Sequence, residues 1–255
     1  MNHSCSPNCY CPLICRTPDL MTYDAIAIKD IEIGDEITCD YALFDYECDG
    51  HQIVECGCKS ANCRGRMTGF KELSLEEKFR VMEYCDKEIL DQWCLDENVL
   101  ILESQLPQGI ELVIHGEYEN SYSLAATKAF EPGEIVYKNT SVLLPNDVAK
   151  ATYIIKLAGR YILLKPEEHF LFRPEYKEFV GFDTFQNHSC DPSVYQTYMN
   201  KTDYTVYAKK KILPGDLITM DYAELANLAE NLENITTCSF HCTCGAKHCR
   251  GFIIA

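Results

Sequence analysis

The pattern of apolar and polar positions twice predicts a strand, a turn and a second strand. Residues 25–42 read AIAIKDIEIGDEITCDYA and residues 205–223 read TVYAKKKILPGDLITMDYA. In each segment, short apolar and partly β-branched runs flank a Gly-Asp pair, which is a turn signal. The pairs are Gly34-Asp35 and Gly215-Asp216. Each segment is therefore predicted to form a hairpin-like unit.

Residues 72–93 carry a helical period instead. Apolar residues recur there close to helical spacing: Leu75, Phe79, Met82 and Ile89. Ser74 and Glu77 have the spacing of a capping box, which satisfies backbone N–H groups at the start of a helix. We predict that residues 67–106 form a helical connector; the alternative is a helix that packs as part of the preceding segment.

Residues 107–150 contain short apolar runs that predict several strands, with a turn at Pro132-Gly133. The next stretch, residues 147–164, reads DVAKATYIIKLAGRYILL and predicts a helix that begins near Asp147. Gly159 would be a weak point or an end of that helix. These elements precede the second strand–turn–strand unit.

An internal repeat relates residues 1–66 to residues 186–251. Four features recur in the same order: an Asn-His-Ser-Cys element, the strand–turn–strand unit, Asp-Tyr-Ala, and C-x-C-x4-C-R-G. The first element begins at Asn2 in the first copy and at Asn187 in the second. Residues 107–150 have no counterpart before the first copy, so only the second copy has an N-terminal half.

The chain holds 16 cysteines, and their clustering predicts bound metal. Each C-x-C-x4-C sequence offers three thiolates, whereas a structural zinc ion takes four ligands in a closed tetrahedron. The repeat suggests that the fourth ligand is the cysteine of the Asn-His-Ser-Cys element. The two predicted sets are Cys5 with Cys56, Cys58 and Cys63, and Cys190 with Cys242, Cys244 and Cys249. Alternative ligands are Cys9, Cys11, Cys15, Cys238, His241 and His248.

Composition and charge restrict the class of partner. With 47% hydrophobic residues the 255-residue chain can bury a core, and no run of apolar residues is long enough to predict a membrane span. The polar N-terminus lacks the pattern of a signal peptide, so a nuclear or cytoplasmic protein is expected. The net charge of −16 disfavours direct contact with nucleic acid and favours a basic partner, unless it serves only solubility.

Taken together, these sequences resemble the SET-domain family of S-adenosylmethionine-dependent protein-lysine methyltransferases. The resemblance rests on LAATKAFEPGEIV from Leu124, NHSCDP from Asn187, GDLITMDYAE from Gly215 and CTCGAKHCRGF from Cys242. It covers residues 107–255 as one complete domain with a zinc-binding post-SET tail, and residues 1–66 as the C-terminal half of another. It implies an α+β, mainly β fold, the SET or β-clip fold, in which the Asn-His-Ser segment passes under a loop in a knot-like crossing.

The resemblance also implies roles for single residues. Tyr222 is the expected catalytic residue, whose hydroxyl helps to hold the lysine amine in line with the transferred methyl group. The residues expected to contact S-adenosylmethionine are Ser121, Tyr122, Ser123, Asn187, His188 and Phe240. Tyr195 and Tyr207 are candidates for lining the lysine channel. An ordinary structural role is the alternative for these two tyrosines and for Phe240.

Two departures from the family pattern bear on activity. The family's Gly-x-Gly cofactor loop is replaced by serine, tyrosine and serine at residues 121–123, and serine has less backbone freedom than glycine. The closing Asn of the motif is Ser193, whereas the first copy keeps it as Asn8. Because the first copy opens the chain at Met1, it is expected to be either a remnant half-domain kept for its zinc site or part of a longer protein.

We therefore predict that residues 107–255 are a protein-lysine N-methyltransferase that uses S-adenosylmethionine and contains structural Zn²⁺. The expected substrate is a lysine-containing protein or peptide, and a histone tail fits the acidic charge. Nucleic acid and membrane are not expected as direct partners. The competing hypothesis is a catalytically inactive SET-like module, stabilised by zinc, that binds other proteins.

Overall fold

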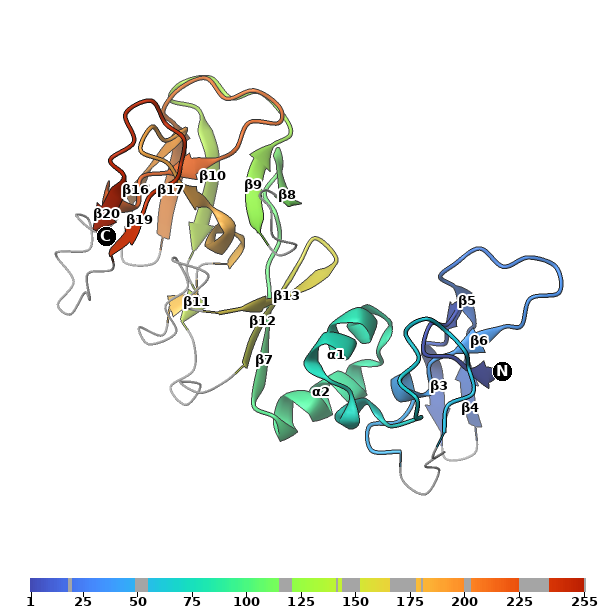
Figure 1. Ribbon diagram of the computed structural model, residues 1–255. Helices are drawn as coiled ribbons and strands as arrows, with labels where there is room; N and C mark the ends of the chain where they lie inside the picture. The colour runs from blue at the N-terminus through green and yellow to red at the C-terminus, as the bar shows by residue number, and fades with distance from the viewer. Residues whose placement is uncertain are drawn as a thin grey trace. The chain divides into compact units, whose positions relative to one another are not determined.

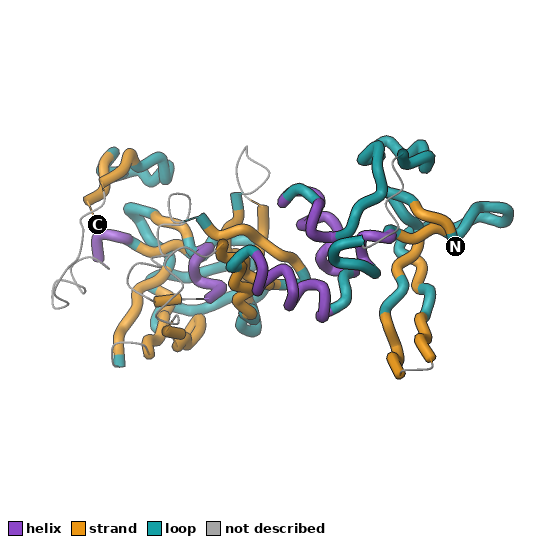
Figure 2. Tube along the Cα trace, turned by 90° about the horizontal axis from the view of Figure 1, so that it is seen from below, coloured by secondary structure: helices purple, strands orange, loops and turns teal. Residues whose placement is uncertain are grey.

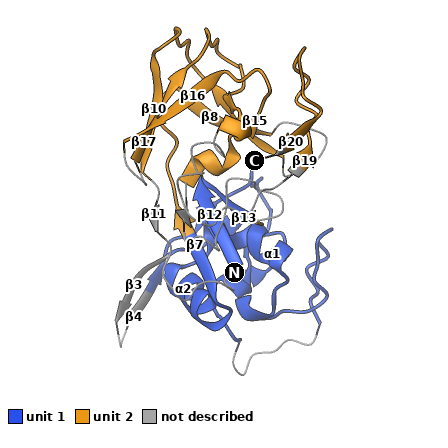
Figure 3. Cartoon of the chain, turned by 90° about the vertical axis from the view of Figure 1, so that its left-hand side faces the viewer, with its two compact units in different colours: residues 1–101, 150–163 blue, residues 102–149, 164–255 orange. Residues whose placement is uncertain are grey.

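The computed structural model describes residues 1–17, 20–48, 55–114, 121–140, 142–143, 152–165, 178–179, 181–199, 203–224 and 239–254. The chain divides into two compact units, coloured in Figure 3: residues 1–101 with 150–163, and residues 102–149 with 164–255. Figure 1 labels their helices and strands. Strands and loops make up most of the chain (Figure 2). In the part of the chain described, every helix is too short or too polar to cross a membrane.

Unit 1 begins with three pairs of short strands. β1 (Asn2–His3) runs parallel to β6 (Thr38–Cys39), β2 (Cys9–Tyr10) pairs antiparallel with β5 (Ile26–Ala27), and β3 (Leu13–Thr17) pairs antiparallel with β4 (Leu20–Tyr23). Gly34, with φ +101°, lies in the predicted turn between β5 and β6. These two strands pair with β2 and β1 instead of with each other, so the strands and the turn are confirmed but the hairpin is not.

Short helices follow in unit 1: η1 (Tyr41–Leu43), η2 (Phe70–Glu72), α1 (Leu75–Val81), η3 (Met82–Tyr84) and α2 (Lys87–Asp96), where η marks a 3₁₀ helix. The predicted capping box is confirmed: the Glu77 N–H donates to Ser74 Oγ at 3.3 Å, and the Ser74 N–H donates to Glu77 Oε2 at 2.8 Å. The helical character predicted for residues 72–93 is confirmed, but it is divided among α1, η3 and α2. Cys85, the C-cap of η3, and Asp86, the N-cap of α2, have extended backbone, with ψ 139° and 142°, and so separate the two helices.

The core of unit 1 joins these helices to the first copy of the repeat. Its buried residues are Ala42, Phe70, Leu73, Met82, Ile89, Leu90, Trp93, Val99 and Ile154. The rings of Phe70 and Trp93 are fully buried and meet edge to face, with centroids 5.7 Å apart. The helices therefore pack against the first copy. The domain boundaries after residues 66 and 106 remain sequence-based predictions.

A three-stranded sheet of order β13-β12-β7 contains β7 (Val99–Glu103), β12 (Thr152–Leu157) and β13 (Arg160–Leu164). The predicted helix over residues 147–164 is therefore wrong from residue 152 onward, and its start lies outside the described residues. Ala158 and Gly159 both have positive φ, 50° and 74°, as a two-residue turn between neighbouring strands requires. The sequence signal failed because a continuous apolar run suits a buried strand as well as a helix.

Unit 2 is built from short strands. They are β8 (Ile110–Ile114), β9 (Tyr122–Ala126), β10 (Ile135–Thr140), β11 (Val142–Leu143), β14 (Glu178–Phe179), β16 (Val194–Tyr198), β17 (Asp203–Ala208), β19 (Ser239–His241) and β20 (Phe252–Ile254). The antiparallel pairs are β8 with β9, β11 with β14, and β19 with β20, and a separate sheet has the order β10-β17-β16. Gly133, with φ +84°, confirms the predicted turn between β9 and β10.

The second Asn-His-Ser-Cys element repeats the arrangement of the first. β15 (Asn187–His188) follows the 3₁₀ helix η5 (Gly181–Phe185) and runs parallel to β18 (Thr219–Met220). A parallel pair needs a long connection, which here contains the β16–β17 hairpin. The molecule is thus α+β and mainly β, as predicted, and the pairing places the motif beside Asp221 and Tyr222.

Candidate active site and cysteine clusters

Tyr222 is held against the Asn-His element by its backbone and by its hydroxyl group. Its backbone N–H donates to Nδ1 of His188 at 3.2 Å, and its hydroxyl donates to the carbonyl of Gln186 at 2.6 Å. The side chain is buried, and burial raises the pKa of the phenol well above its usual value. The hydroxyl therefore stays protonated at neutral pH and can orient a neighbouring group but cannot serve as a base.

His188 is the second anchor of this site. Its Nδ1 atom, which accepts from Tyr222, lies 3.8 Å from a carboxylate oxygen of Asp221, and the same carboxylate accepts from the guanidinium of Arg250. Burial lowers the pKa of His188 and outweighs the opposing charge of Asp221. A neutral imidazole fits a hydrogen-bond acceptor at Nδ1.

Asn187 contacts the strand that replaces the glycine-rich loop. Its Nδ2 atom donates to Oγ of Ser123 at 2.5 Å and to the carbonyl of Tyr122 at 3.3 Å. Tyr122 and Ser123 lie in β9, and neither has positive φ, so serine is accommodated without left-handed backbone. The structure thus brings the predicted cofactor residues of β9 and β15 together, but the Asn187 amide is already bonded to Ser123.

The ring of Phe240 lies beside the rings of Tyr222 and His188. Its ring centroid is 6.1 Å from that of Tyr222 and 6.3 Å from that of His188. Tyr195 and Tyr207 stack on each other, with centroids 5.4 Å apart and planes inclined by 18°, on β16 and β17. This stacking gives the two tyrosines a structural contact, and their role in a lysine channel remains a prediction.

Ser193 performs the hydrogen bonding that Asn8 performs in the first copy. The Thr219 N–H donates to Ser193 Oγ at 2.8 Å, and this hydroxyl donates to the Leu217 carbonyl at 3.0 Å. In the first copy, Asn8 accepts from the Thr38 N–H at 2.8 Å and donates to the Glu36 carbonyl at 2.9 Å. Thr38 and Glu36 are the repeat counterparts of Thr219 and Leu217. The replacement of asparagine by serine therefore keeps both hydrogen bonds.

A group of buried polar residues just before the motif was missed by sequence reasoning. Tyr137 donates to Gln186 Oε1 at 2.8 Å, and Asn139 Nδ2 donates to Asp183 Oδ2 at 3.0 Å. Burial raises the pKa of the Asp183 carboxyl to about 8. Three polar side chains in the stretch GFDTFQ were the available signal, because polar residues between aromatic ones suggest a buried network. Through Gln186 this network reaches the hydroxyl of Tyr222.

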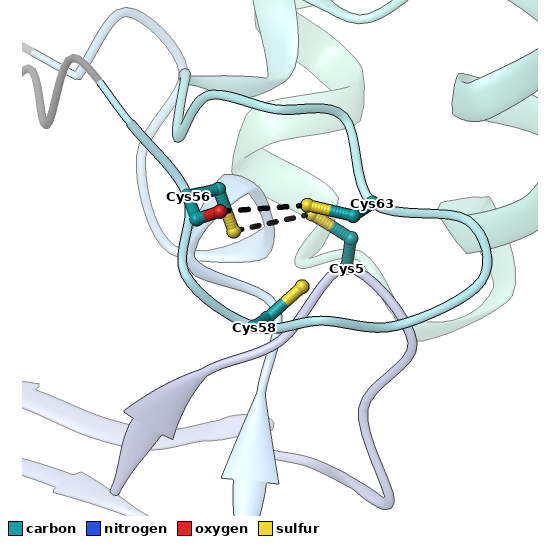
Figure 4. A group of neighbouring side chains, drawn as sticks. All are labelled: Cys5, Cys56, Cys58 and Cys63. Atoms are coloured by element: carbon teal, nitrogen blue, oxygen red, sulfur yellow. Dashed lines mark hydrogen bonds between the residues drawn. The ribbon is translucent and has the colours of Figure 1, made fainter.

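The first predicted cysteine set is assembled. The sulfur atoms of Cys5, Cys56, Cys58 and Cys63 lie within 4.8 Å of one another, and Figure 4 shows the four side chains pointing toward a common centre. The Cys5 and Cys56 sulfur atoms are 3.8 Å apart. Tetrahedral zinc with Zn–S distances of about 2.3 Å sets its sulfur ligands about 3.8 Å apart, so this set fits a structural zinc ion.

The second cluster lies beside a histidine, as the first does. Cys190, Cys242 and Cys244 lie within 4.8 Å of one another together with His188, and Cys249 Sγ lies 3.5 Å from the Cys242 carbonyl oxygen. The Cys190 and Cys242 sulfur atoms are 3.7 Å apart, again close to a tetrahedral edge. Either Cys249 or His188 could complete four ligands, and Cys249 as the fourth ligand remains a prediction.

One thiol in each cluster is favoured as the thiolate that a metal requires. Burial opposes ionisation of Cys58, but hydrogen bonds from the Ser60 hydroxyl and from backbone N–H groups outweigh it and lower the pKa of the thiol to about 5. In the second copy burial likewise opposes ionisation of Cys244, and backbone N–H groups of Cys190 and Ala246 lower its pKa to about 6. In each cluster one thiol is thus favoured as a thiolate, whereas burial raises the pKa of Cys5 and of Cys242 to about 12.

The alternative ligands lie elsewhere or outside the described residues. Cys9 and Cys11 are buried and belong to neither group. The side chain of Cys15, and the whole of Cys238, lie outside the described part of the chain. His241 packs against the ring of Phe252, with centroids 5.8 Å apart.

Comparison with known proteins agrees with this geometry. The family model described as "SET domain" matches residues 1–42 and 121–223, which is more than half of the chain and includes the first part of each copy. A histone-lysine N-methyltransferase, H3 lysine-4 specific, of Cryptococcus neoformans is 28% identical over 142 residues, which is 52% of this chain and 9% of the relative. Human histone-lysine N-methyltransferase SETD2 is 36% identical over 75 residues, 29% of this chain and 3% of the relative.

Among solved structures, the methyltransferase domain of human histone-lysine N-methyltransferase SETMAR aligns over 56% of each chain with 15% identity and a TM-score of 0.33. The chain matches less than a tenth of the length of the two curated relatives. Both Asn-His-Ser-Cys elements and both Asp-Tyr-Ala sequences lie within the matched ranges, in the order and the pairing described above, whereas the two C-x-C-x4-C sequences lie outside them. The chain therefore belongs to the SET-domain family.

Proposed function

We propose that residues 107–255 form a protein-lysine N-methyltransferase that transfers a methyl group from S-adenosylmethionine to a lysine side chain. The observation that carries this proposal is the double attachment of Tyr222, through its N–H to His188 and through its hydroxyl to the Gln186 carbonyl. These bonds fix a buried phenol against the backbone that enters the Asn-His element. Such fixed positioning can lower a reaction barrier by several kcal/mol.

In the proposed reaction the substrate amine must be neutral before it attacks. The unperturbed pKa of a lysine is about 10.4, and burial disfavours the ammonium form, so a narrow dry site lowers that pKa. Tyr222 keeps its proton and orients the amine, because burial raises the pKa of its phenol. S-adenosylmethionine, when bound, would supply an electrophilic methyl group; the residues proposed to hold it are Ser121, Tyr122, Ser123, Asn187, His188 and Phe240.

We propose that both cysteine clusters bind structural Zn²⁺. Tetrahedral spacing of the sulfur atoms and the lowered pKa values of Cys58 and Cys244 support this assignment. In the second copy the metal would hold the tail next to Cys190 and so bring Phe240 to Tyr222. A basic protein segment is the proposed substrate, since the chain has a net charge of −16. Histone tails, and with them a nuclear location, fit this chemistry.

A second candidate function is a non-catalytic interaction module. The hydrogen bond between Asn187 and Ser123 favours it, because the serine occupies an amide that the enzyme proposal assigns to the cofactor. The two candidates differ in one binding property. Titration calorimetry with S-adenosylmethionine should show binding for an enzyme, and no heat of binding would support the module.

The transfer reaction itself provides the test of the enzyme proposal. The zinc-loaded chain is incubated with methyl-labelled S-adenosylmethionine and, in separate reactions, mixed histones and a cell lysate. We expect label in protein and, after hydrolysis, in methyl-lysine. Binding of the cofactor without label in any protein would exclude these substrates, and absence of both would overturn the proposal.

A further inference from the structure

The imidazole of His188 contacts both the second cysteine cluster and the backbone of Tyr222. Its Nδ1 atom accepts the Tyr222 N–H at 3.2 Å, and its Nε2 atom lies 3.4 Å from Sγ of Cys190. The side chain is only 5% exposed, so both contacts are shielded from water. One buried ring therefore connects a predicted metal ligand to the expected catalytic residue.

The hydrogen bond at Nδ1 fixes the position of the ring proton. A nitrogen atom that accepts a backbone N–H carries no proton of its own, so the imidazole of His188 is neutral and its proton is on Nε2. A protonated nitrogen cannot bind a metal ion, whereas it can donate to a thiolate, which is a strong acceptor. The geometry thus favours donation from Nε2 to Cys190 over binding of a metal ion at Nε2.

The first copy separates these two roles, because it has four clustered cysteines as well as the histidine. Nδ1 of His3 accepts the Tyr41 N–H at 3.2 Å, and its Nε2 atom lies 3.2 Å from Cys5 Sγ. Four sulfur atoms already provide a full tetrahedral set there, so His3 lies beside the ligand set and outside it. The paired contacts of the histidine therefore occur without its being needed as a ligand.

Cys249 has the surroundings in the second copy that Cys63 has in the first. Sγ of Cys249 lies 3.5 Å from the Cys242 carbonyl. Sγ of Cys63 lies 3.6 Å from the Cys56 carbonyl. Each of these two sulfur atoms also accepts, at 3.4 Å, the N–H of the glycine two residues later. A fourth thiol is thus available to the second cluster without His188.

A second connection joins the same sulfur atom to the tyrosine segment. The Arg250 N–H donates to Cys190 Sγ at 3.4 Å, and the Arg250 guanidinium donates to Asp221, the residue before Tyr222. The first copy repeats the backbone contact, since the Arg64 N–H donates to its own cluster at 3.4 Å. The sulfur of Cys190 is therefore surrounded by N–H groups whose residues also hold the Asp-Tyr pair.

We propose that His188 is a positioning residue that couples the metal of the second cluster to Tyr222, by donating from Nε2 to the Cys190 thiolate and accepting the Tyr222 N–H at Nδ1. Hydrogen-bonding partners of this kind orient metal ligands and are in turn oriented by them. The thiolate fixes the ring, and the ring fixes the backbone of Tyr222. The consequence for catalysis rests on the proposed function, whereas the two hydrogen bonds do not.

Nuclear magnetic resonance of the full chain tests the bridge directly. The chain is loaded with NMR-active cadmium in place of zinc and isotope-labelled at the nitrogen atoms of histidine and tyrosine. We expect a proton on Nε2 of both His188 and His3, and a scalar coupling between the Tyr222 nitrogen and His188 Nδ1 across the hydrogen bond. A proton on Nδ1 of His188, or a one-bond coupling between cadmium and its Nε2, would overturn the proposal.

Matched asparagine variants measure what the donor at Nε2 contributes. His188→Asn keeps an acceptor near Nδ1 but removes the donor to Cys190. We expect a chelator to remove cadmium from the second cluster at about a tenfold lower concentration, and kcat at saturating S-adenosylmethionine to fall about tenfold. His3→Asn should weaken the first cluster alone and leave transfer unchanged. His248→Asn, an exposed histidine next to Cys249 in the sequence, should change neither cluster.

The outcomes separate this proposal from the proposed function. Unchanged cadmium affinity of the second cluster in His188→Asn would overturn the bridge. A kcat that recovers fully at saturating S-adenosylmethionine would also overturn it, because His188 would then act only through cofactor binding. If the unaltered chain transfers no methyl group, the proposed function fails, and the ring proton and the coupling to Tyr222 still decide whether the bridge exists.

Discussion

The first and second copies share a framework but differ in what covers and supports it. In both, a parallel strand pair brings Asn-His next to Asp-Tyr, and the histidine Nδ1 accepts the tyrosine N–H at 3.2 Å. Tyr222 is buried and its hydroxyl donates to Gln186, whereas the Tyr41 hydroxyl donates to the Met1 carbonyl at an exposed site. The parallel strand pair and the histidine–tyrosine hydrogen bond thus occur in both copies, whereas of the two tyrosines only Tyr222 is buried.

The two copies also neutralise the charge of their buried aspartate differently. In the first copy Arg64 makes two hydrogen bonds to Asp40, of 2.6 and 2.7 Å, and both side chains are buried. In the second copy Arg250 contacts Asp221 while its own side chain is 42% exposed. The first copy thus depends on a buried ion pair where the second has a partly solvated one.

Among the variants proposed, loss of a cysteine ligand should have the largest effect on stability. Cys56→Ser removes one ligand of the first cluster, and a structural zinc site contributes on the order of 10 kcal/mol of binding free energy to folding. We expect metal analysis to fall from two zinc ions to one per chain and unit 1 to lose its cooperative thermal transition. Cys94→Ser, in the same unit but outside the cluster, is the control. Unchanged zinc content in Cys56→Ser would contradict the metal site.

Replacing each arginine by alanine should show that the two ion pairs contribute differently to the free energy of unfolding. Arg64→Ala leaves Asp40 buried without its ion pair, which should cost about 3–5 kcal/mol in the free energy of unfolding. Arg250→Ala should cost about 1 kcal/mol or less, because that guanidinium is partly exposed to water. Urea denaturation measures both values. Equal losses would show that the difference in burial has no energetic consequence.

The buried Asp183 gives the second copy a pH dependence of its own. Its pKa is about 8 in the folded chain against 3.8 for an exposed carboxyl, so the unfolded chain releases a proton that the folded chain keeps. The free energy of unfolding should therefore fall as pH rises from about 4 to 8. Asp183→Asn should remove this loss and stabilise the chain by a few kcal/mol at pH 8, and much less at pH 4.

Thermal melts across this pH range measure the difference between Asp183→Asn and the parent chain. The amide oxygen of the substituted side chain can still accept from Asn139, so the neighbouring hydrogen bond is kept. A difference in stability that is the same at pH 4 and pH 8 would show that the carboxyl does not titrate in this window.

A small effect should come from the closing position of the motif, where the two copies use different side chains. Ser193→Ala leaves the partly buried Thr219 N–H and Leu217 carbonyl without a side-chain partner and should cost about 1–2 kcal/mol. Asn8→Ala should cost about 1 kcal/mol, because water can reach the exposed Glu36 carbonyl. Ser193→Asn restores the residue of the first copy and should be close to neutral. A large loss in Ser193→Asn would contradict the equivalence of the two side chains.

The sequence predicted the features that depend on local spacing or on the repeat. Cys5, Cys56, Cys58 and Cys63 come together as expected, because the repeat identified a ligand distant in the chain. Residues 152–164 were predicted as a helix, because a continuous apolar run is compatible with either element. The turn at Ala158 and Gly159, where φ is positive, divides this run into two strands. Tertiary pairing, by contrast, has no local signature.

Two aspects of the candidate site also depended on tertiary structure. The sequence did not indicate that Ser123 would bond to the Asn187 amide, since that contact joins strands far apart in the chain. Nor did it predict that His188 would lie within 4.8 Å of Cys190, Cys242 and Cys244. In both cases a polar group has several suitable partners in the sequence, and tertiary packing determines which of them it contacts.

Matched tyrosine variants test the central claim, that the second copy carries the transferase chemistry. Methyl transfer from labelled S-adenosylmethionine to mixed histones is measured for Tyr222→Phe and Tyr41→Phe, which remove equivalent hydroxyl groups from the two copies. We predict that Tyr222→Phe lowers the rate about 100-fold and that Tyr41→Phe leaves it unchanged. Transfer that persists in Tyr222→Phe, or that is lost in Tyr41→Phe, would contradict the account.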